Sequence, residues 1–220
     1  MNKIVTLLCI MLFASAQAQP LTDWQLMNLK GKVKRLKVHT YTDRSNIKWG
    51  DDTDYNFDDK GYIQSVTAYS IGESTGLKII KKSLVYGAYE NQKREIKGIS
   101  GFTNRDYHEV QEWLYPTEYR STIYAVFPSN NNKTILGRCD AEGRLIYETN
   151  KTHDMGSEEM YEYSEEGQLV CIVITTDDLF VQYTEVAQGA LDAMGNPMET
   201  VYNHRDGFIT TITYTYEYYE

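Results

Sequence analysis

Apolar and polar residues alternate with a period of two along much of this chain, which is the pattern of strands with one buried face. The clearest case is segment 208–219, where every second residue is aromatic, apolar or threonine: Phe208, Thr210, Ile212, Tyr214, Tyr216 and Tyr218. Half of the positions between them are threonine: Thr211, Thr213 and Thr215. This segment is predicted to be one long, half-buried strand, about 40 Å in length at ~3.3 Å per residue.

Two other segments are also predicted to be strands. Residues 33–41 are rich in residue types that favour strands. Residues 169–176 are apolar at both alternating sets of positions, which predicts a central strand covered on both sides.

Helix is predicted to be a minor component. Thr22 or Asp23 is suited to cap a short helical turn at 23–29, because both side chains accept hydrogen bonds from the first helical N–H groups. Segment 109–114 is a second candidate for a helical turn, and 129–132 is predicted to be a loop.

A short phrase occurs four times: an aromatic or apolar residue, Asp or Ser, two variable positions, Gly, one variable position, and usually Ile or Leu. The four copies are 57–63, 139–145, 163–169 and 191–197, and a looser version surrounds Gly207. Asp or Ser caps a backbone N–H two residues on, and Gly supplies the positive φ of a tight hairpin. The predicted turn residues are Asp58, Gly61, Asp140, Gly143, Ser164, Gly167, Asp192, Gly195 and Gly207.

Bends and strands together predict an all-β fold with minor helix. The expected architecture is an antiparallel meander of repeated β-hairpins that forms one extended, twisted or partly rolled sheet. No linker divides the chain, so residues 19–220 are expected to form a single β-repeat domain.

Residues 1–18 have the features of a cleaved secretory signal peptide. Lys3 precedes an apolar run from Ile4 to Phe13, and Ala16 and Ala18 form a small-residue cleavage site before Gln19. The run is too short to span a bilayer, and no later apolar stretch reaches ~20 residues. The mature chain is therefore expected to be exported to the periplasm or the cell surface, with no membrane-spanning segment after signal removal.

The chain is acidic. Its formal charge is −9, and loss of Lys3 with the signal makes it −10. Because no basic cluster is present, nucleic acid is not an expected partner.

Two cysteines remain after signal removal. Cys139 ends the strand entering one bend and Cys171 lies in the strand leaving the next. In a simple meander two strands separate them, so free thiols are favoured; a wrapped or rolled sheet would leave a disulfide open.

The repeated phrase resembles the YD repeat of the RHS family, whose units carry Tyr-Asp, two free positions and Gly. Segments 140–145 and 192–196 match it best, whereas Cys139 and Leu191 replace the aromatic residue and Ser164 replaces Asp. The signal and the hairpins also resemble small secreted proteins of Gram-negative bacteria. The resemblance implies an architecture of hairpins and transfers no catalytic residue.

The densest group of oxygen ligands lies before the first repeated turn. Asp52, Asp54, Asn56 and Asp58 share one face of an extended segment, and hard cations such as Ca²⁺ prefer carboxylate and amide oxygens. Phe57 occupies the position where an EF-hand loop needs Gly, so a solvated strand face is the competing interpretation. No other cofactor is expected.

Aromatic residues are the remaining candidates for ligand or partner contact. Trp49 and Trp113 lie in polar or irregular surroundings, and Tyr214, Tyr216 and Tyr218 form a stripe that is able to stack on a sugar or a protein. At strand spacing, such a stripe is more often a packing ladder.

Three functional hypotheses follow. The first is a non-enzymatic binding or scaffold module for a protein or glycan of the cell envelope, which recognises its partner through sheet edges and aromatic surface. The second is a small outer-membrane β-barrel, opposed by charge on both faces of 32–39 and by an ending at Glu220 instead of an aromatic residue. The third is a hydrolase with an unrecognised site.

Overall fold

The computed structural model describes residues 20–44, 47–71, 77–101, 105–124, 132–152, 155–178 and 180–220. The predicted signal peptide, residues 1–18, and most of the predicted 129–132 loop lie outside these ranges. Within them, no helix is long and apolar enough to cross a membrane.

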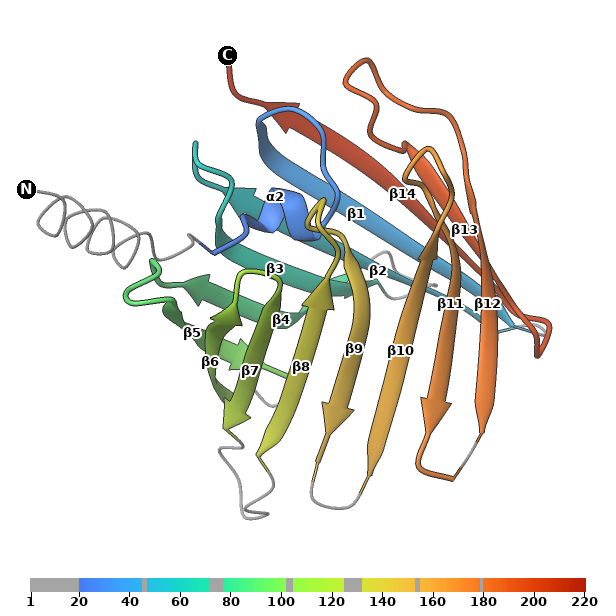
Figure 1. The fold of residues 1–220 in the computed structure, drawn as a ribbon. Helices are drawn as coiled ribbons and strands as arrows, with labels where there is room; N and C mark the ends of the chain where they lie inside the picture. Colours follow the sequence, from blue (N-terminus) through green and yellow to red (C-terminus); the bar gives the residue numbers. More distant parts are fainter. Residues whose placement is uncertain are drawn as a thin grey trace, which may run out of the picture.

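The chain forms a closed antiparallel β-barrel of fourteen strands in its described part, in which each strand pairs with its neighbours in sequence (Figure 1). The strands are β1 (Val33–Arg44), β2 (Ile47–Phe57), β3 (Ile63–Ile71), β4 (Lys78–Tyr86), β5 (Lys93–Ser100), β6 (Arg105–Tyr115), β7 (Glu118–Tyr124), β8 (Lys133–Cys139), β9 (Leu145–Lys151), β10 (Gly156–Tyr163), β11 (Leu169–Thr176), β12 (Val181–Gln188), β13 (Glu199–His204) and β14 (Ile209–Tyr218). One short helix, α2 (Asp23–Leu26), precedes them.

Closure is a correction to the open or partly rolled sheet expected from sequence. The first strand pairs with the last over nearly its whole length, from Val33 opposite Tyr218 to Asp43 opposite Ile209. Because β1 also pairs with β2, it has no free edge. The expected meander is confirmed, and the hairpins close on themselves.

Two local predictions were also wrong. Segment 109–114 belongs to strand β6; its neighbours on β5 and β7 supply a ladder of hydrogen bonds that outweighs local helix preference. Strand β11 is not covered on both sides, because Val170 is 40% exposed.

The lumen side of the wall is identified by the core. Leu36 is 1% exposed and packs in a cluster with Val33, Phe57, Ile63 and Val66. Residues directly opposite each other in paired strands share a face. Tyr216 and Tyr55 are opposite Leu36 and therefore point inward, whereas Lys37 and its partners Asp54 and Thr215 point outward.

The predicted hairpin turns are confirmed. In all five, the Gly N–H donates to the carbonyl three residues earlier, at 2.9–3.2 Å, and φ of the Gly lies between 80° and 93°. The Asp58 carboxylate accepts from Lys60 N and Tyr62 N at 3.0 and 2.9 Å. Asp140 and Asp192 form the equivalent pairs of bonds, and Ser164 forms one bond, to Gln168 N.

The capped helical turn is confirmed as well. Thr22 is the N-cap of α2 and forms a capping box with Gln25, which satisfies backbone N–H groups that a short helix leaves free. In Figure 1, α2 lies inside one end of the barrel, beside β1 and β2.

Two turn glycines provide a matched test of this packing. A Cβ atom on Gly61 would lie 2.4 Å from Trp24 Cε3, whereas one on Gly207 would meet nothing within 4 Å. We expect Gly207→Ala to lower the free energy of unfolding by about 1 kcal/mol, through backbone strain alone. Gly61→Ala should cost roughly 1–3 kcal/mol more, because the ring must shift. Urea denaturation of both variants measures the difference; equal losses would contradict close packing of Trp24 on the turn.

Candidate functional site

The segment between the predicted cleavage site and β1, residues 20–32, lies in one mouth of the barrel (Figure 1), and we call it the plug. Trp24, Met27 and Leu29 pack against the core cluster of β1–β3. Leu21 and Leu26 pack against a second cluster formed by Trp113, Tyr119 and Cys139. The plug therefore bridges two separate stretches of the wall.

The four repeated turns surround the plug. Gly61 O accepts from Trp24 N at 3.2 Å, and Gly167 O accepts from Asn28 Nδ2 at 3.1 Å. The Gly143 position lies against Leu21 and Gln25. In the fourth turn, Asn196 accepts from Lys30 N at 2.7 Å and donates to Lys30 O at 2.8 Å. The sequence repeat is thus a ring of docking points at one rim, while the Gly207 turn joins β13 and β14 at the other.

A buried ion pair anchors the plug to the wall. The guanidinium of Arg94 donates two hydrogen bonds of 2.7 Å to the two oxygens of Asp23, and Ile63 N donates to Asp23 Oδ2 at 2.7 Å. Both residues are 4% exposed. A pair this deeply buried is stable only because each charge has its partner and its hydrogen bonds.

Aromatic and amide side chains complete the surroundings of Arg94. Its guanidinium lies 4.9 Å from the centre of the Tyr86 ring and 4.7 Å from that of Tyr89, and Arg94 Nε donates to Gln111 Oε1 at 2.7 Å. Burial raises the pKa of Tyr86 and Tyr89, so both phenols remain neutral. Burial alone would lower the pKa of Arg94, but its bonds to Asp23 raise it.

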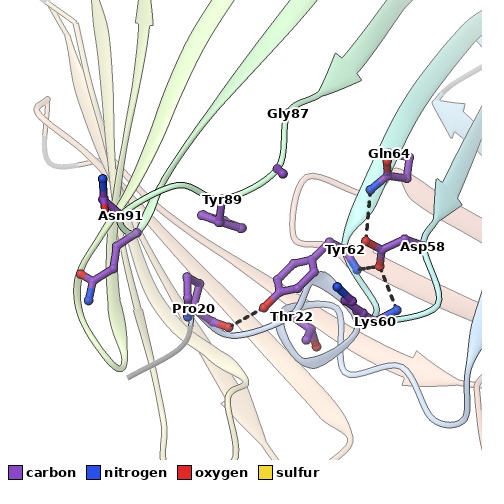
Figure 2. Close-up of a pocket in the computed structure, with 11 residues that line it drawn as sticks. Pro20, Thr22, Asp58, Lys60, Tyr62, Gln64, Gly87, Tyr89 and Asn91 are labelled. Carbon is purple, nitrogen blue, oxygen red and sulfur yellow. Dashed lines mark hydrogen bonds between the residues drawn. The ribbon is translucent and has the colours of Figure 1, made fainter. Parts of the chain in front are cut away.

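Beside the plug is a pocket of about 530 Å³, which we call the rim pocket. Three stretches of the chain form its wall: Pro20 and Thr22 of the plug, the β2–β3 turn from Asp58 to Gln64, and the β4–β5 loop from Gly87 to Gln92 (Figure 2). Tyr62 OH donates to Pro20 O at 3.1 Å and ties the turn to the plug.

The β4–β5 loop has an uncommon backbone. Asn91 and Gln92 both have positive φ, 50° and 67°, and Glu90 and Lys93 exchange backbone hydrogen bonds of 2.7 and 3.0 Å across them. This is the two-residue hairpin in which Asn-Gly is the preferred sequence. Gln92 therefore stands where glycine is favoured.

The lumen carries a polar cluster on the wall from β4 to β10. Three inward carboxylates each accept a hydrogen bond from a tyrosine: Glu109 from Tyr107, Glu148 from Tyr119 and Glu159 from Tyr161. Ser121 also donates to Glu109. Burial raises the pKa of Glu148 and lowers that of Lys82, which lies 4.9 Å from the Tyr107 ring.

A second pocket, of about 400 Å³, lies at the other mouth. Lys133, Asn150, Ser157 and Thr176 line it together with Asp177 and Asp178. Asn150 Oδ1 is buried and has no hydrogen-bond partner among the described residues. Inward residues near the middle of strands, such as Tyr161 and Ile172, are only half-buried, so the lumen keeps accessible space.

The outer wall, by contrast, carries ladders of ion pairs. Arg35 Nη2 lies 3.0 Å from Asp54 Oδ2. Lys93 Nζ and Arg120 Nη2 lie 2.9 and 2.6 Å from the two oxygens of Glu112, across β5, β6 and β7. Hydrogen bonds from Lys93 and Arg120 lower the pKa of Glu112, so the group is charged at neutral pH.

The acidic residues predicted to bind Ca²⁺ have other partners. Asp52 contacts His39, at 2.7 Å, and Lys78; partial burial would raise its pKa, but these hydrogen bonds lower it. Asn56 donates to Ser65, and Asp58 accepts from its own turn. Across the described ranges, no group of three or more His, Cys, Asp or Glu side chains is arranged to hold a metal ion.

The aromatic candidates divide into two groups. Trp113 is 3% exposed, so its assignment to the surface was wrong; it lies inward on β6, where its ring packs on Tyr119. Tyr214, Tyr216 and Tyr218 also point inward and stack with ring centres 6.2 Å apart, as a packing ladder does. Trp49 is 41% exposed but lies opposite Thr42, on the face that Leu36 turns inward, so it stays a candidate for contact from within the lumen.

Cys139 and Cys171 are free, as predicted. Burial raises the pKa of the Cys139 thiol to about 12, and burial also raises that of Cys171. Neither thiol is poised to act as a nucleophile at neutral pH.

Sequence inspection missed Asp23 as an ion-pair partner, Arg94, the rim pocket and the luminal carboxylates. Asp23 was visible only as a candidate helix cap. Arg94 is 71 residues from its partner, so no local pattern joins the two. One local signal was available for the rim pocket. Asn91-Gln92 lies between two strand-like segments, and Asn is a common turn residue, so a turn could have been predicted there.

The fold defines the class: a closed, antiparallel β-barrel with one mouth plugged by its own N-terminal segment. No protein-family model matches the chain, and no curated protein matches it in sequence. The YD-repeat resemblance therefore has no support beyond the turns themselves. A solved structure with a similar fold is a porin-like protein from Bacteroides uniformis. It is 12% identical, with a TM-score of 0.55 over 86% of this chain and 99% of that chain.

The Asp23–Arg94 pair predicts a large effect on stability. Asp23→Ala should lower the free energy of unfolding by about 3–5 kcal/mol, because it leaves a buried guanidinium unpaired. Arg120→Ala, which breaks an exposed pair, should cost about 0–1 kcal/mol. The double variant Asp23→Leu/Arg94→Met should recover part of the loss. Chemical denaturation measures all three, and a loss for Asp23→Ala no larger than that for Arg120→Ala would contradict the role of the pair.

The partners of Asp52 and Asp54 predict an outcome for metal removal. Because cationic side chains already neutralise these carboxylates, Ca²⁺ and EDTA should both leave the melting temperature unchanged. A decrease with EDTA that Asp52→Ala/Asp54→Ala abolishes would instead establish the Ca²⁺ site.

Proposed function

We propose that the chain is an exported β-barrel of the bacterial cell envelope that binds a ligand through its lumen and mouths, with its outer wall in water. Closure supports a barrel over the scaffold hypothesis, because a sheet without free edges offers none for strand addition. The likeness to a porin-like protein points the same way. The aromatic stripe lies in the lumen and is not a docking surface on the outside.

The direction of the alternation carries the proposal. Membrane barrels place apolar side chains outward and polar ones inward. Here Leu36, Val38 and Tyr216 point inward, while Lys37, Asp52 and Asp54 point outward from the middle of their strands. A Lys or Arg on a lipid-facing wall costs ~2–4 kcal/mol at the bilayer midplane, and many such positions add up to a prohibitive sum.

The second candidate is an outer-membrane β-barrel. The observation that favours it is the fold of the porin-like protein from Bacteroides uniformis, which aligns over 99% of its own chain. This candidate shares the cell-envelope location proposed above but requires the outer wall to meet lipid.

We also propose that the protein is not an enzyme. The buried carboxylates are bound to tyrosine or arginine, and the high pKa values of the thiols oppose nucleophilic chemistry. Inward His204 lies 3.2 Å from Thr184 Oγ1 and 3.3 Å from Thr210 Oγ1, and burial lowers its pKa.

Fractionation tests the water-facing wall. The mature chain, residues 19–220, should be released from cells without detergent and should melt cooperatively in plain buffer. A resident outer-membrane barrel of the same cells serves as the control and should stay in the pellet. Recovery only with detergent would overturn the proposal and favour the second candidate.

A surface variant sharpens this test. Thr213 and Thr215 lie on the outer wall of β14. In water, Thr213→Leu/Thr215→Leu should create an apolar patch and promote aggregation; in lipid it should be neutral or favourable. Light scattering of the purified variant against the unaltered protein separates the two environments.

A further inference from the structure

We infer that the rim pocket binds a short glycan of one or two sugar units, held by the Asn91 and Gln92 amides and the Lys60 ammonium against the rings of Tyr62 and Tyr89. This deepens the proposed function by assigning a ligand class to one mouth. It depends on that function only in taking the glycan from the cell envelope.

The pocket has the size and construction of a binding site. Its volume of about 530 Å³ lies within the ~300–1,000 Å³ typical of small-ligand sites. Its walls are held without any ligand: Tyr62 bonds to Pro20 O, Trp24 N bonds to Gly61 O, and Trp113 N bonds to Gln92 O at 2.9 Å. Little ordering is therefore required on binding.

Some polar side chains of the pocket already form hydrogen bonds within the protein, and others do not. The Asp58 carboxylate accepts from two backbone N–H groups and from Gln64 Nε2, and Thr22 Oγ1 bonds to Gln25. The Asn91 and Gln92 amides and Lys60 Nζ form no hydrogen bond or ion pair with the described residues. Each free amide offers two donors and one acceptor, the complement of a sugar's vicinal hydroxyl groups.

The backbone at Gln92 is an independent sign of function. Glycine fits the second position of this hairpin without strain, yet Gln92 occupies it with φ of 67°. A side chain kept at a strained position beside a pocket indicates that the side chain has a use. The same tight turn holds Asn91 next to it, so one rigid element carries two amides at one edge of the pocket.

The aromatic part of the wall favours a sugar over other polar ligands. The Tyr62 and Tyr89 rings lie 5.5 Å apart at 59°, and Tyr89 OH donates to Gln111 Oε1 at 2.8 Å. Both hydroxyls are engaged in the wall, and the Arg94 guanidinium lies 4.7 Å from the centre of the Tyr89 ring. The ring surface that remains is apolar and suits the C–H face of a pyranose. A hydrocarbon ligand would leave the amides unpaired, and a polyphosphate would need more cations than Lys60.

Titration calorimetry of the mature chain with N,N′-diacetylchitobiose and with digalacturonic acid tests the inference. We expect saturable binding of at least one of these sugars. Gln92→Gly should weaken it at least fivefold, the equivalent of one lost hydrogen bond, while the melting temperature stays equal or rises because glycine relieves the turn. Lys60→Ala should weaken digalacturonic acid only.

The matched control is Asn203→Ala, which removes an exposed amide from the outer wall of β13 and should leave affinity unchanged. No saturable binding of either sugar at millimolar concentration would overturn the inference, and so would full affinity in Gln92→Gly. Failure of the proposed function would be a separate result. If the barrel needs detergent, the water-facing wall is wrong, but sugar binding at the rim pocket can still be titrated in detergent.

Discussion

The pairing of β1 with β14 is the constraint on which the rest of the structure depends. It turns a chain of hairpins into a closed wall and removes both sheet edges, so that an exposed strand no longer offers a template for other chains. It also decides which alternating face of each strand is enclosed. Once Leu36 and Tyr216 are turned toward the lumen, Lys37 and Thr215 must face out, and the same parity passes from strand to strand around the barrel.

Closure of the wall leaves a mouth at each end of the barrel, and the four repeated turns lie around one of them. Their Asp and Ser side chains satisfy N–H groups within each turn, while Gly61 and Gly167 present carbonyl oxygens to the plug. The repeat therefore has a structural reason beyond chain reversal: it sets four turns at one rim, and each of them contacts the plug. Asp23 and Arg94 then fix the plug at a single position, since their geometry is bidentate.

The parts of the fold that follow from local chemistry were predictable. The hairpin turns, the Thr22 cap and the long strand 208–219 were all predicted from residues within a few positions of one another, and the free cysteines followed from the order of the hairpins. Closure was not, because nothing in β1 or β14 alone states that they pair across nearly the whole chain. The candidate site depends on the same long-range contacts: Arg94 meets Asp23, and Trp113 enters the core, only after the wall has curved. Segment 109–114 shows the converse, since its weak helical preference yields to two neighbouring strands.

Alternation itself cannot tell a membrane barrel from a barrel in water, because both have a period of two. The two kinds of barrel differ in whether the apolar or the polar face is enclosed. The sequence alone did not say which face closure would enclose. Charge on both faces of 32–39 counted against an outer-membrane barrel, yet Arg35, Lys37 and His39 share one face by alternation. Lys34, at the bulge between Val33 and Arg35, pairs with Glu217, which lies opposite Arg35 on that same outer face. With the bulge, the charged side chains of 34–39 lie together on the outer face of β1. Under the proposed function, in which this wall faces water, the apolar and aromatic surface acts from within, where the lumen and the rim pocket lie.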